Sequence, residues 1–194
     1  MSKFVIAIGR EYGSGGLEIA KKLAAALDVP YYDRDLIALA AQKRGISADV
    51  VEQADEVKAK PWDTPAVVGM PSFNDKVFEL QAEIIREKAE TESCVIVGRC
   101  ADQLLKHRDD CLSVFIHADP EVRIRRIMNE HKLGREEATR LMKRTDKSRR
   151  AYYQYYTDCT WGGRGSYDLI LNSGKLGIDC VVAVILKAIE GTAK

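Results

Sequence analysis

The chain has 194 residues, a length typical of one globular domain; 46% of them are hydrophobic and 30% are charged. This composition excludes collagen-like, low-complexity and wholly disordered chains. Thirty Lys and Arg against 29 Asp and Glu leave a formal net charge of +1, which argues against a general nucleic-acid or membrane-surface binder.

The first 28 residues predict a strand, a glycine loop and a helix. Residues 3–8 are a short β-branched apolar run that ends at a glycine, as in a buried parallel strand. Residues 9–16 are rich in glycine, and residues 17–27 place apolar side chains at helical spacing.

The glycine loop predicts a phosphate site. Its residues Gly13, Ser14, Gly15 and Gly16 are small, so successive backbone N–H groups can point into one concavity. The N-terminus of the following helix adds partial positive charge, which favours an anion. The alternative is a tight turn in which the glycines only satisfy backbone geometry.

The loop lacks the lysine of the regular pattern Gly-x-x-x-x-Gly-Lys-Ser/Thr. The lysine position falls on Gly16 and the Mg²⁺-binding hydroxyl on Leu17. Arg10 is the nearest replacement charge, and Ser14 carries the nearest hydroxyl.

Further short apolar runs predict strands at residues 29–32, 94–97, 112–116 and 167–171. Helices are expected from Asp33 to residue 41, from 47, from 72, from Asp119, from 135 to 156 and from 176 to 189. This alternation predicts an α/β fold with a parallel sheet covered on both faces. Ligands of such sheets bind at the carboxyl ends of the strands, where residues 9–16, 98–102 and 172–173 would meet.

Residues 121–150 are strongly basic, with eleven Lys and Arg against five Asp and Glu, and a tyrosine-rich stretch follows at 152–156. Clustered arginines suit phosphates, so one interpretation is a phosphate clamp. A solvated helix and an RNA-binding segment are the alternatives. The phosphate loop elsewhere in the chain favours the clamp.

The five cysteines are odd in number and form no Cys-x-x-Cys, which argues against a disulfide scaffold or a zinc ribbon. We expect reduced thiols in a cytoplasmic protein. No apolar run approaches the ~20 residues of a membrane helix, and the N-terminus has no pattern of a secretion signal, so no membrane partner is expected.

Taken together, several motifs resemble the cytidylate kinase-like family. They lie in order along almost the whole chain, and they are GREYGSGG at 9–16, YYDRDLI at 31–37, VIVGRCAD at 95–102, DPEVR at 119–123, the segment 144–156, and YDLILNS at 167–173. The resemblance implies a P-loop NTPase three-layer sandwich with a five-stranded parallel sheet, helices on both faces and a helical lid. One kinase-like domain would span residues 1–194, with an acceptor-binding region at about 33–90 and a lid at about 128–160.

The resemblance also implies an activity, which is ATP-dependent phosphoryl transfer to CMP or dCMP, assisted by Mg²⁺ that enters with ATP. ATP and a nucleoside monophosphate would be the partners of a monomer or homodimer. The expected site residues, by role, are Gly13, Ser14, Gly15 and Gly16 for the ATP phosphates; Arg10, Arg144, Arg149 and Arg150 for catalysis; Asp33, Arg34, Asp35, Arg99 and Asp146 for the acceptor; Asn172 and Ser173 beside the adenine; and Asp102 toward Mg²⁺. By the same resemblance, Asp146 would either orient the lid arginines or contact the base.

The chain departs from the family pattern at the loop lysine and around the Gly98-Arg99 motif, where Val97 and Cys100 replace aspartates. Kinase activity would therefore depend on Arg10, the lid arginines and Asp102 as substitutes. Three alternatives stay open: a nucleotide-binding or sensory module that has lost catalysis, a kinase for another small acceptor, and an RNA-binding module.

Overall fold

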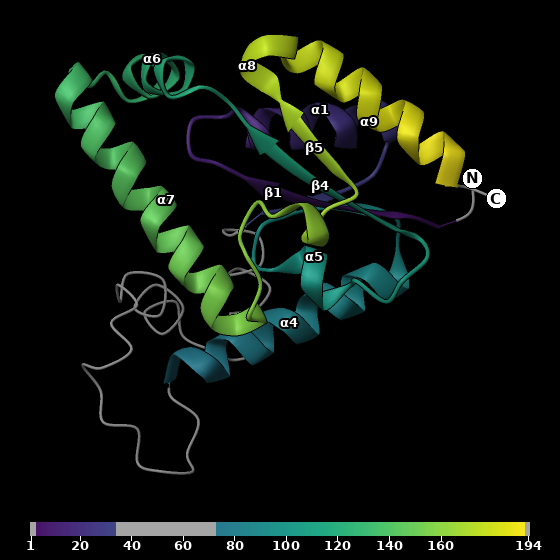
Figure 1. Ribbon diagram of the computed structural model, residues 1–194. Helices are drawn as coiled ribbons and strands as arrows, with labels where there is room; N and C mark the ends of the chain where they lie inside the picture. Colours follow the sequence, from purple (N-terminus) through teal and green to yellow (C-terminus); the bar gives the residue numbers. More distant parts are fainter. Residues whose placement is uncertain (1–2, 34–72, 193–194) are drawn as a thin grey trace.

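A computed structural model describes residues 3–33 and 73–192. A parallel sheet of five strands lies at the centre, in the order β2-β3-β1-β4-β5 (Figure 1). The strands are β1 (Val5–Arg10), β2 (Tyr31–Tyr32), β3 (Cys94–Val97), β4 (Cys111–His117) and β5 (Leu169–Asn172). The α/β fold class expected from the sequence is confirmed.

The middle strand β1 shows why the sheet needs cover on both faces, since all but its last residue are buried. Ile6 and Ile8 belong to a core that includes α1 (Gly16–Leu27) and α9 (Ile178–Thr192). Val5 and Ala7 face the opposite layer, with α4 (Phe73–Thr91) and α5 (Ala101–Leu104). Alternate side chains of one strand therefore hold two helical layers, as the period of a strand requires.

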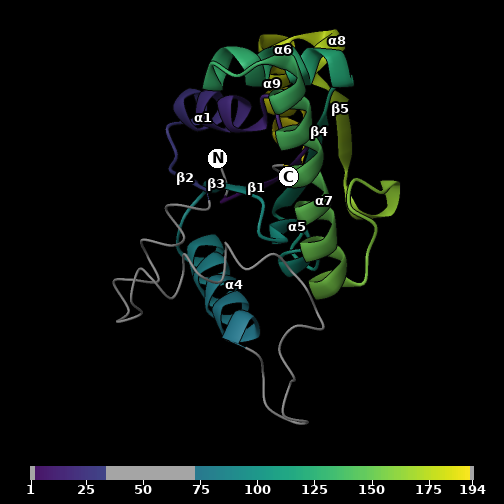
Figure 2. The ribbon, with the colours of Figure 1, turned by 90° about the vertical axis from the view of Figure 1, so that its left-hand side faces the viewer.

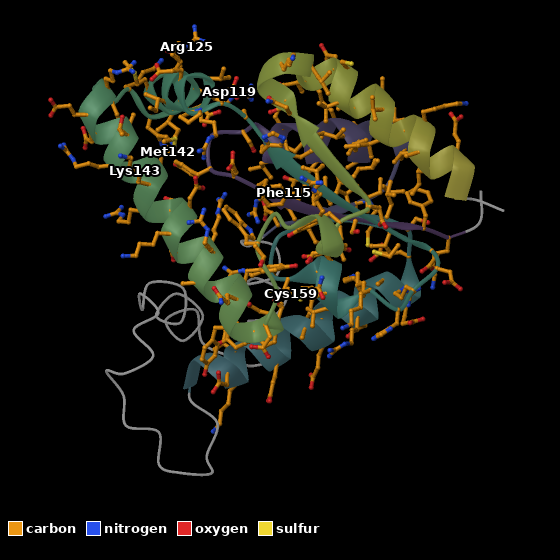
Figure 3. The ribbon with its side chains drawn as sticks, viewed as in Figure 1. Phe115, Asp119, Arg125, Met142, Lys143 and Cys159 are labelled. Atoms are coloured by element: carbon orange, nitrogen blue, oxygen red, sulfur yellow. The ribbon has the colours of Figure 1, made fainter. Side chains whose placement is uncertain are left out.

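The basic segment forms two helices at the carboxyl edge of the sheet, α6 (Pro120–His131) and α7 (Arg135–Thr157). Figure 2 shows α7 in front of the strand ends, and Figure 1 shows it descending from α6 toward α4. Met142 and Lys143 are neighbours on the upper part of α7 (Figure 3), but Met142 is buried against α6 while Lys143 is exposed. The solvated-helix interpretation thus holds for only one side of α7.

Some predicted boundaries were wrong. The last strand begins at Leu169 instead of residue 167. The predicted closing helix 176–189 is α9, which begins two residues later, at Ile178, and a short helix before it, α8 (Ser173–Leu176), was not predicted. Gly177 separates α8 from α9 with a φ of 81° and a ψ of 158°, a conformation that favours glycine and cannot continue a helix. Asp119 stands at the N-cap of α6 as predicted, but its side chain makes no capping hydrogen bond.

All five cysteines are free thiols in the structure. Within residues 3–33 and 73–192, no helix has the length and apolar character needed to cross a membrane.

Candidate active site

The loop between β1 and α1 has the geometry of an anion-binding turn. Gly13 and Gly15 have φ angles of 74° and 79°, a region that side chains disfavour. A Cβ on Gly13 would also lie 2.9 Å from the carbonyl oxygen of Arg123. Helix α1 begins at Gly16, so its free N–H groups open onto this loop. The predicted strand, loop and helix are therefore all present.

Arg10 occupies the space that a side chain at Gly16 would need. A Cβ placed on Gly16 would lie 2.6 Å from the Cβ of Arg10 and 2.9 Å from its Cγ. Farther out, the guanidinium of Arg10 lies over Gly98, where any Cβ would overlap it. The side chain of Arg10 thus runs from the glycine loop to the turn that follows β3.

Two further arginines lie near Arg10. Burial, followed by the positive charges of Arg149 and Arg99, lowers the pKa of Arg10 well below its ordinary value. Arg149 donates from Nη1 to the carbonyl oxygen of Arg10 at 3.1 Å, and its guanidinium lies 5.4 Å from the ring centre of Tyr12. Because a guanidinium keeps its proton in proteins, this convergence of cations favours a bound anion.

The turn after β3 presents Arg99 from a strained backbone. Gly98, Arg99 and Cys100 have consecutive positive φ angles of 79°, 55° and 57°. Such conformations are costly for residues with a side chain and are common at functional sites. The guanidinium of Arg99 lies 5.4 Å from the ring centre of Tyr152 on α7. The turn and α7 therefore meet at the same edge of the sheet.

A cavity of about 660 Å³ opens beside the glycine loop. Arg10 and Arg149 line it, together with Asp33 at the end of β2 and the glycines of the loop. Arg144 and Arg150 are exposed on α7, and Arg150 lies 5.8 Å from the ring centre of Trp161. Of the four arginines expected to be catalytic, the structure therefore brings Arg10 and Arg149 into this cavity.

Three of the expected site residues hold the loop and its surroundings. Asp146 is buried on α7, where its carboxylate accepts a hydrogen bond from the backbone N–H of Tyr12 at 2.8 Å. Ser173 donates its hydroxyl hydrogen to the carbonyl oxygen of Ser14 at 2.6 Å. Asn172 caps α8 by accepting from the N–H of Lys175 at 3.1 Å. Each of these side chains has a partner within the protein.

The hydroxyl of Ser14 is also directed inward. It donates to the carbonyl oxygen of Glu11 at 2.8 Å, and the residue is 1% exposed. Arg34 and Asp35, expected to contact the acceptor, lie outside the described residues.

Asp102 is buried away from the cavity. Its carboxylate accepts hydrogen bonds from the hydroxyl of Tyr153 at 2.5 Å and from the amide of Gln103 at 3.3 Å. Among the described residues, no group of three or more His, Cys, Asp or Glu side chains is arranged to hold a metal ion. Mg²⁺ commonly binds through one or two carboxylates plus substrate phosphates and water. The hydrogen bonds from Tyr153 and Gln103 hold Asp102 in the core, so the structure does not bring it into the cavity as the expected contact to Mg²⁺.

The burial of Asp102 predicts a pH-dependent stability. Burial raises the pKa of Asp102 despite the hydrogen bond from Tyr153. The folded state then binds more protons than the unfolded chain, so the free energy of unfolding falls as pH rises from the ordinary Asp pKa through the raised one. We expect Asp102→Asn, which keeps an oxygen for Tyr153, to gain stability relative to wild type between pH 4 and pH 7. Urea unfolding at both pH values measures this gain; an equal difference at the two would contradict it.

Two arginines that were not predicted as site residues are part of this site. The guanidinium of Arg126 covers Gly15 and pairs with Glu18 at 3.1 Å. Arg123 is buried between Glu11 and Asp146. Both arginines were counted in the basic segment, but composition gave no sign of which of its eleven cations face the loop.

The sheet order and the glycine loop define a P-loop kinase fold. Shikimate kinase from Bacteroides thetaiotaomicron is similar over 96% of this chain and 98% of its own, with a TM-score of 0.57 at 18% identity. An uncharacterized protein from Eubacterium ventriosum is more alike, with a TM-score of 0.78 at 31% identity over 97% of this chain and 99% of its own.

The sequence model of the cytidylate kinase-like family matches residues 5–175, and the chain belongs to that family. It is 32% identical to the cytidylate kinase of Archaeoglobus fulgidus over 192 residues, which cover 95% of this chain and 94% of that protein. The cytidylate kinase of Pyrococcus horikoshii is 26% identical over 97% of this chain and 89% of its own length. The resemblance stated from the sequence is therefore confirmed.

Proposed function

We propose that this protein transfers the γ-phosphoryl group of MgATP to a pyrimidine nucleoside monophosphate, CMP or dCMP. Family membership supports a kinase, and the names of the relatives support a cytidine nucleotide as acceptor. The observation that carries the proposal is the convergence of Arg10, Arg99 and Arg149 between the phosphate loop and the turn after β3.

In this proposal Arg10 takes the part of the missing loop lysine. Its stem covers Gly16, and its guanidinium reaches Gly98, so the cation stands between the donor loop and the acceptor motif. In the transition state of phosphoryl transfer, the transferred group carries negative charge on its three outer oxygens. A fixed cation beside these oxygens lowers the activation barrier of the reaction. The same bound phosphates would relieve the repulsion that Arg149 and Arg99 exert on Arg10.

Arg99 would bind the acceptor phosphate, and Arg149 would bind the transferred group from the side of α7. Asp33 is the candidate acceptor contact that lines the cavity. Arg144 and Arg150 would add positive charge at the outer face of α7, and Asn172 and Ser173 would stand on the adenine side. Phosphoryl transfer needs mainly alignment, neutralised charge and exclusion of water, and these residues can supply all three.

A coupled assay of ADP release tests the proposal, with MgATP and a panel of nucleoside monophosphates. We expect turnover with CMP or dCMP above that with UMP, AMP or GMP. Calorimetry on the same samples measures the binding of each nucleotide separately. Turnover with an acceptor outside the pyrimidine series would correct the substrate, and turnover with none would reject the proposed reaction.

The second candidate function is nucleotide binding without catalysis. Two observations favour it: Gly16 stands where a lysine is usual, and Asp102 is turned into the core. Tight binding of ATP with no ADP release on any acceptor would select this candidate. An RNA-binding module, the remaining alternative, would instead show a steep loss of affinity with rising salt.

A further inference from the structure

We propose that Asp146 is a positioning residue that fixes the shape of the phosphate loop from α7. Its Oδ1 accepts the backbone N–H of Tyr12 at 2.8 Å, and its Oδ2 accepts from Nη1 of Arg123 at 2.5 Å. The residue is 9% exposed, although it lies in a helix whose basic side faces water. The catalytic consequence of this role rests on the proposed function, but the structural consequence does not.

Arg123 joins Asp146 to the start of the loop. Its Nε pairs with Oε2 of Glu11 at 3.3 Å, and its Nη1 also donates to the carbonyl oxygen of Tyr12 at 3.3 Å. Glu11 in turn accepts from the N–H of Ala118 at 3.2 Å. The segment just after β4, together with α6 and α7, therefore holds two consecutive residues of the loop, Glu11 and Tyr12.

The charges of this cluster indicate that it fixes the conformation of the loop and does not itself bind phosphate. Glu11, Arg123 and Asp146 together carry two negative charges and one positive charge, so the cluster does not attract phosphate. A buried ion pair of this kind does little for stability by itself, but removal of one partner leaves an uncompensated charge. The cluster is therefore suited to fixing one arrangement of the chain.

Arg149 strengthens this attachment. It lies three residues after Asp146, which places both side chains on one face of α7. Arg149 donates to the carbonyl oxygen of Arg10, while Asp146 accepts from the N–H of Tyr12. Helix α7 thus forms hydrogen bonds to the backbone of the residues on both sides of Glu11. The N–H groups of the loop can bind phosphate well only if they are oriented before it arrives, and these hydrogen bonds would orient them.

A contact between Asp146 and the acceptor base is the competing role. Both of its carboxylate oxygens already have partners in the protein, and the pair with Arg123 is buried. A base would have to displace the buried guanidinium of Arg123, which is a costly exchange. The two roles differ in which substrate a variant affects.

The test compares Asp146→Asn and Asp146→Ala with wild type, and Asp109→Asn serves as a control because Asp109 is exposed. Amide hydrogen exchange of residues 11–16 is measured without nucleotide. We expect both Asp146 variants to exchange faster there, by about tenfold or more for Ala, while β3 stays protected. Asn keeps an oxygen for Tyr12, so its effect should be smaller, and it covers the case in which the Ala variant fails to fold.

Kinetics give the second readout. We expect KM for ATP to rise by about tenfold, kcat to fall, and the preference among acceptors to stay as in wild type. Unchanged exchange at residues 11–16 would overturn the positioning role, even if wild type proves to have no kinase activity. An altered preference among acceptors with an unchanged KM for ATP would overturn the positioning role and support a contact between Asp146 and the acceptor base.

Discussion

Arg10→Ala is expected to lower kcat by about a thousandfold or more, the size typical of losing a cation at the transferred phosphoryl group. The reason is positional: the Arg10 guanidinium lies over Gly98, between the glycine loop that we propose binds the ATP phosphates and the turn after β3 that we propose binds the acceptor. Arg10→Lys should retain part of the activity, because it keeps the charge but loses the planar fork that binds phosphate through two hydrogen bonds. Steady-state kinetics with CMP and calorimetry with ATP measure both effects.

The fold should survive this change. Because Arg149 and Arg99 repel Arg10, its removal relieves an unfavourable interaction, so the unfolding temperature should not fall. Arg125→Ala is the matched control, since Arg125 is exposed on α6, on the outer side of the molecule (Figure 3). Equal activity of Arg10→Ala and wild type would show that Arg10 does not replace the lysine.

Gly16→Lys, which restores the usual loop lysine, is expected to abolish activity instead of raising it. A side chain at this position would meet Cβ and Cγ of Arg10 at 2.6 and 2.9 Å. The Cβ of Arg10 is fixed by the backbone and cannot swing away, so the loop itself must shift. Overpacking of this kind also costs stability, about 1–3 kcal/mol. ADP release and urea unfolding of the variant measure the two losses.

The double variant Arg10→Gly/Gly16→Lys makes this prediction specific. Glycine at position 10 removes both clashing atoms, so the new lysine can occupy the space of the old arginine and restore part of the activity. Gly134→Lys is the control, because a Cβ on Gly134 would meet none of the described residues within 4 Å apart from its own neighbours in the chain. A fully active Gly16→Lys single variant would show that the two positions do not share one space.

Much of the fold was predictable because its elements are local. The run of residues 3–8 and the helical spacing of 17–27 each depend on near neighbours in the chain, and β1 and α1 were predicted within two residues of their ends. Helix α5 was missed because it follows three left-handed residues, two of which, Arg99 and Cys100, are types that seldom adopt this conformation. Helix α8 has four residues, too few for a periodic signal.

The candidate site was predictable in outline only. The glycine loop and Arg10 are adjacent in sequence, so their meeting followed from the strand and helix on either side. The contact between Tyr12 and Asp146 spans 134 positions, and that between Arg123 and Tyr12 spans 111. Such pairs depend on how α6 and α7 pack at the sheet edge, which no local pattern gives. The sequence therefore named Asp146 as an acceptor contact without its partners on the loop.

The most direct test of the account is a transfer experiment with γ-³²P-labelled ATP and CMP, run in parallel on wild type and Arg10→Ala. We expect labelled CDP from the wild type and a loss of about a thousandfold or more in the rate of transfer for the variant. If the wild type binds ATP but passes no label to CMP, dCMP or any other nucleoside monophosphate, the proposed phosphoryl transfer is contradicted.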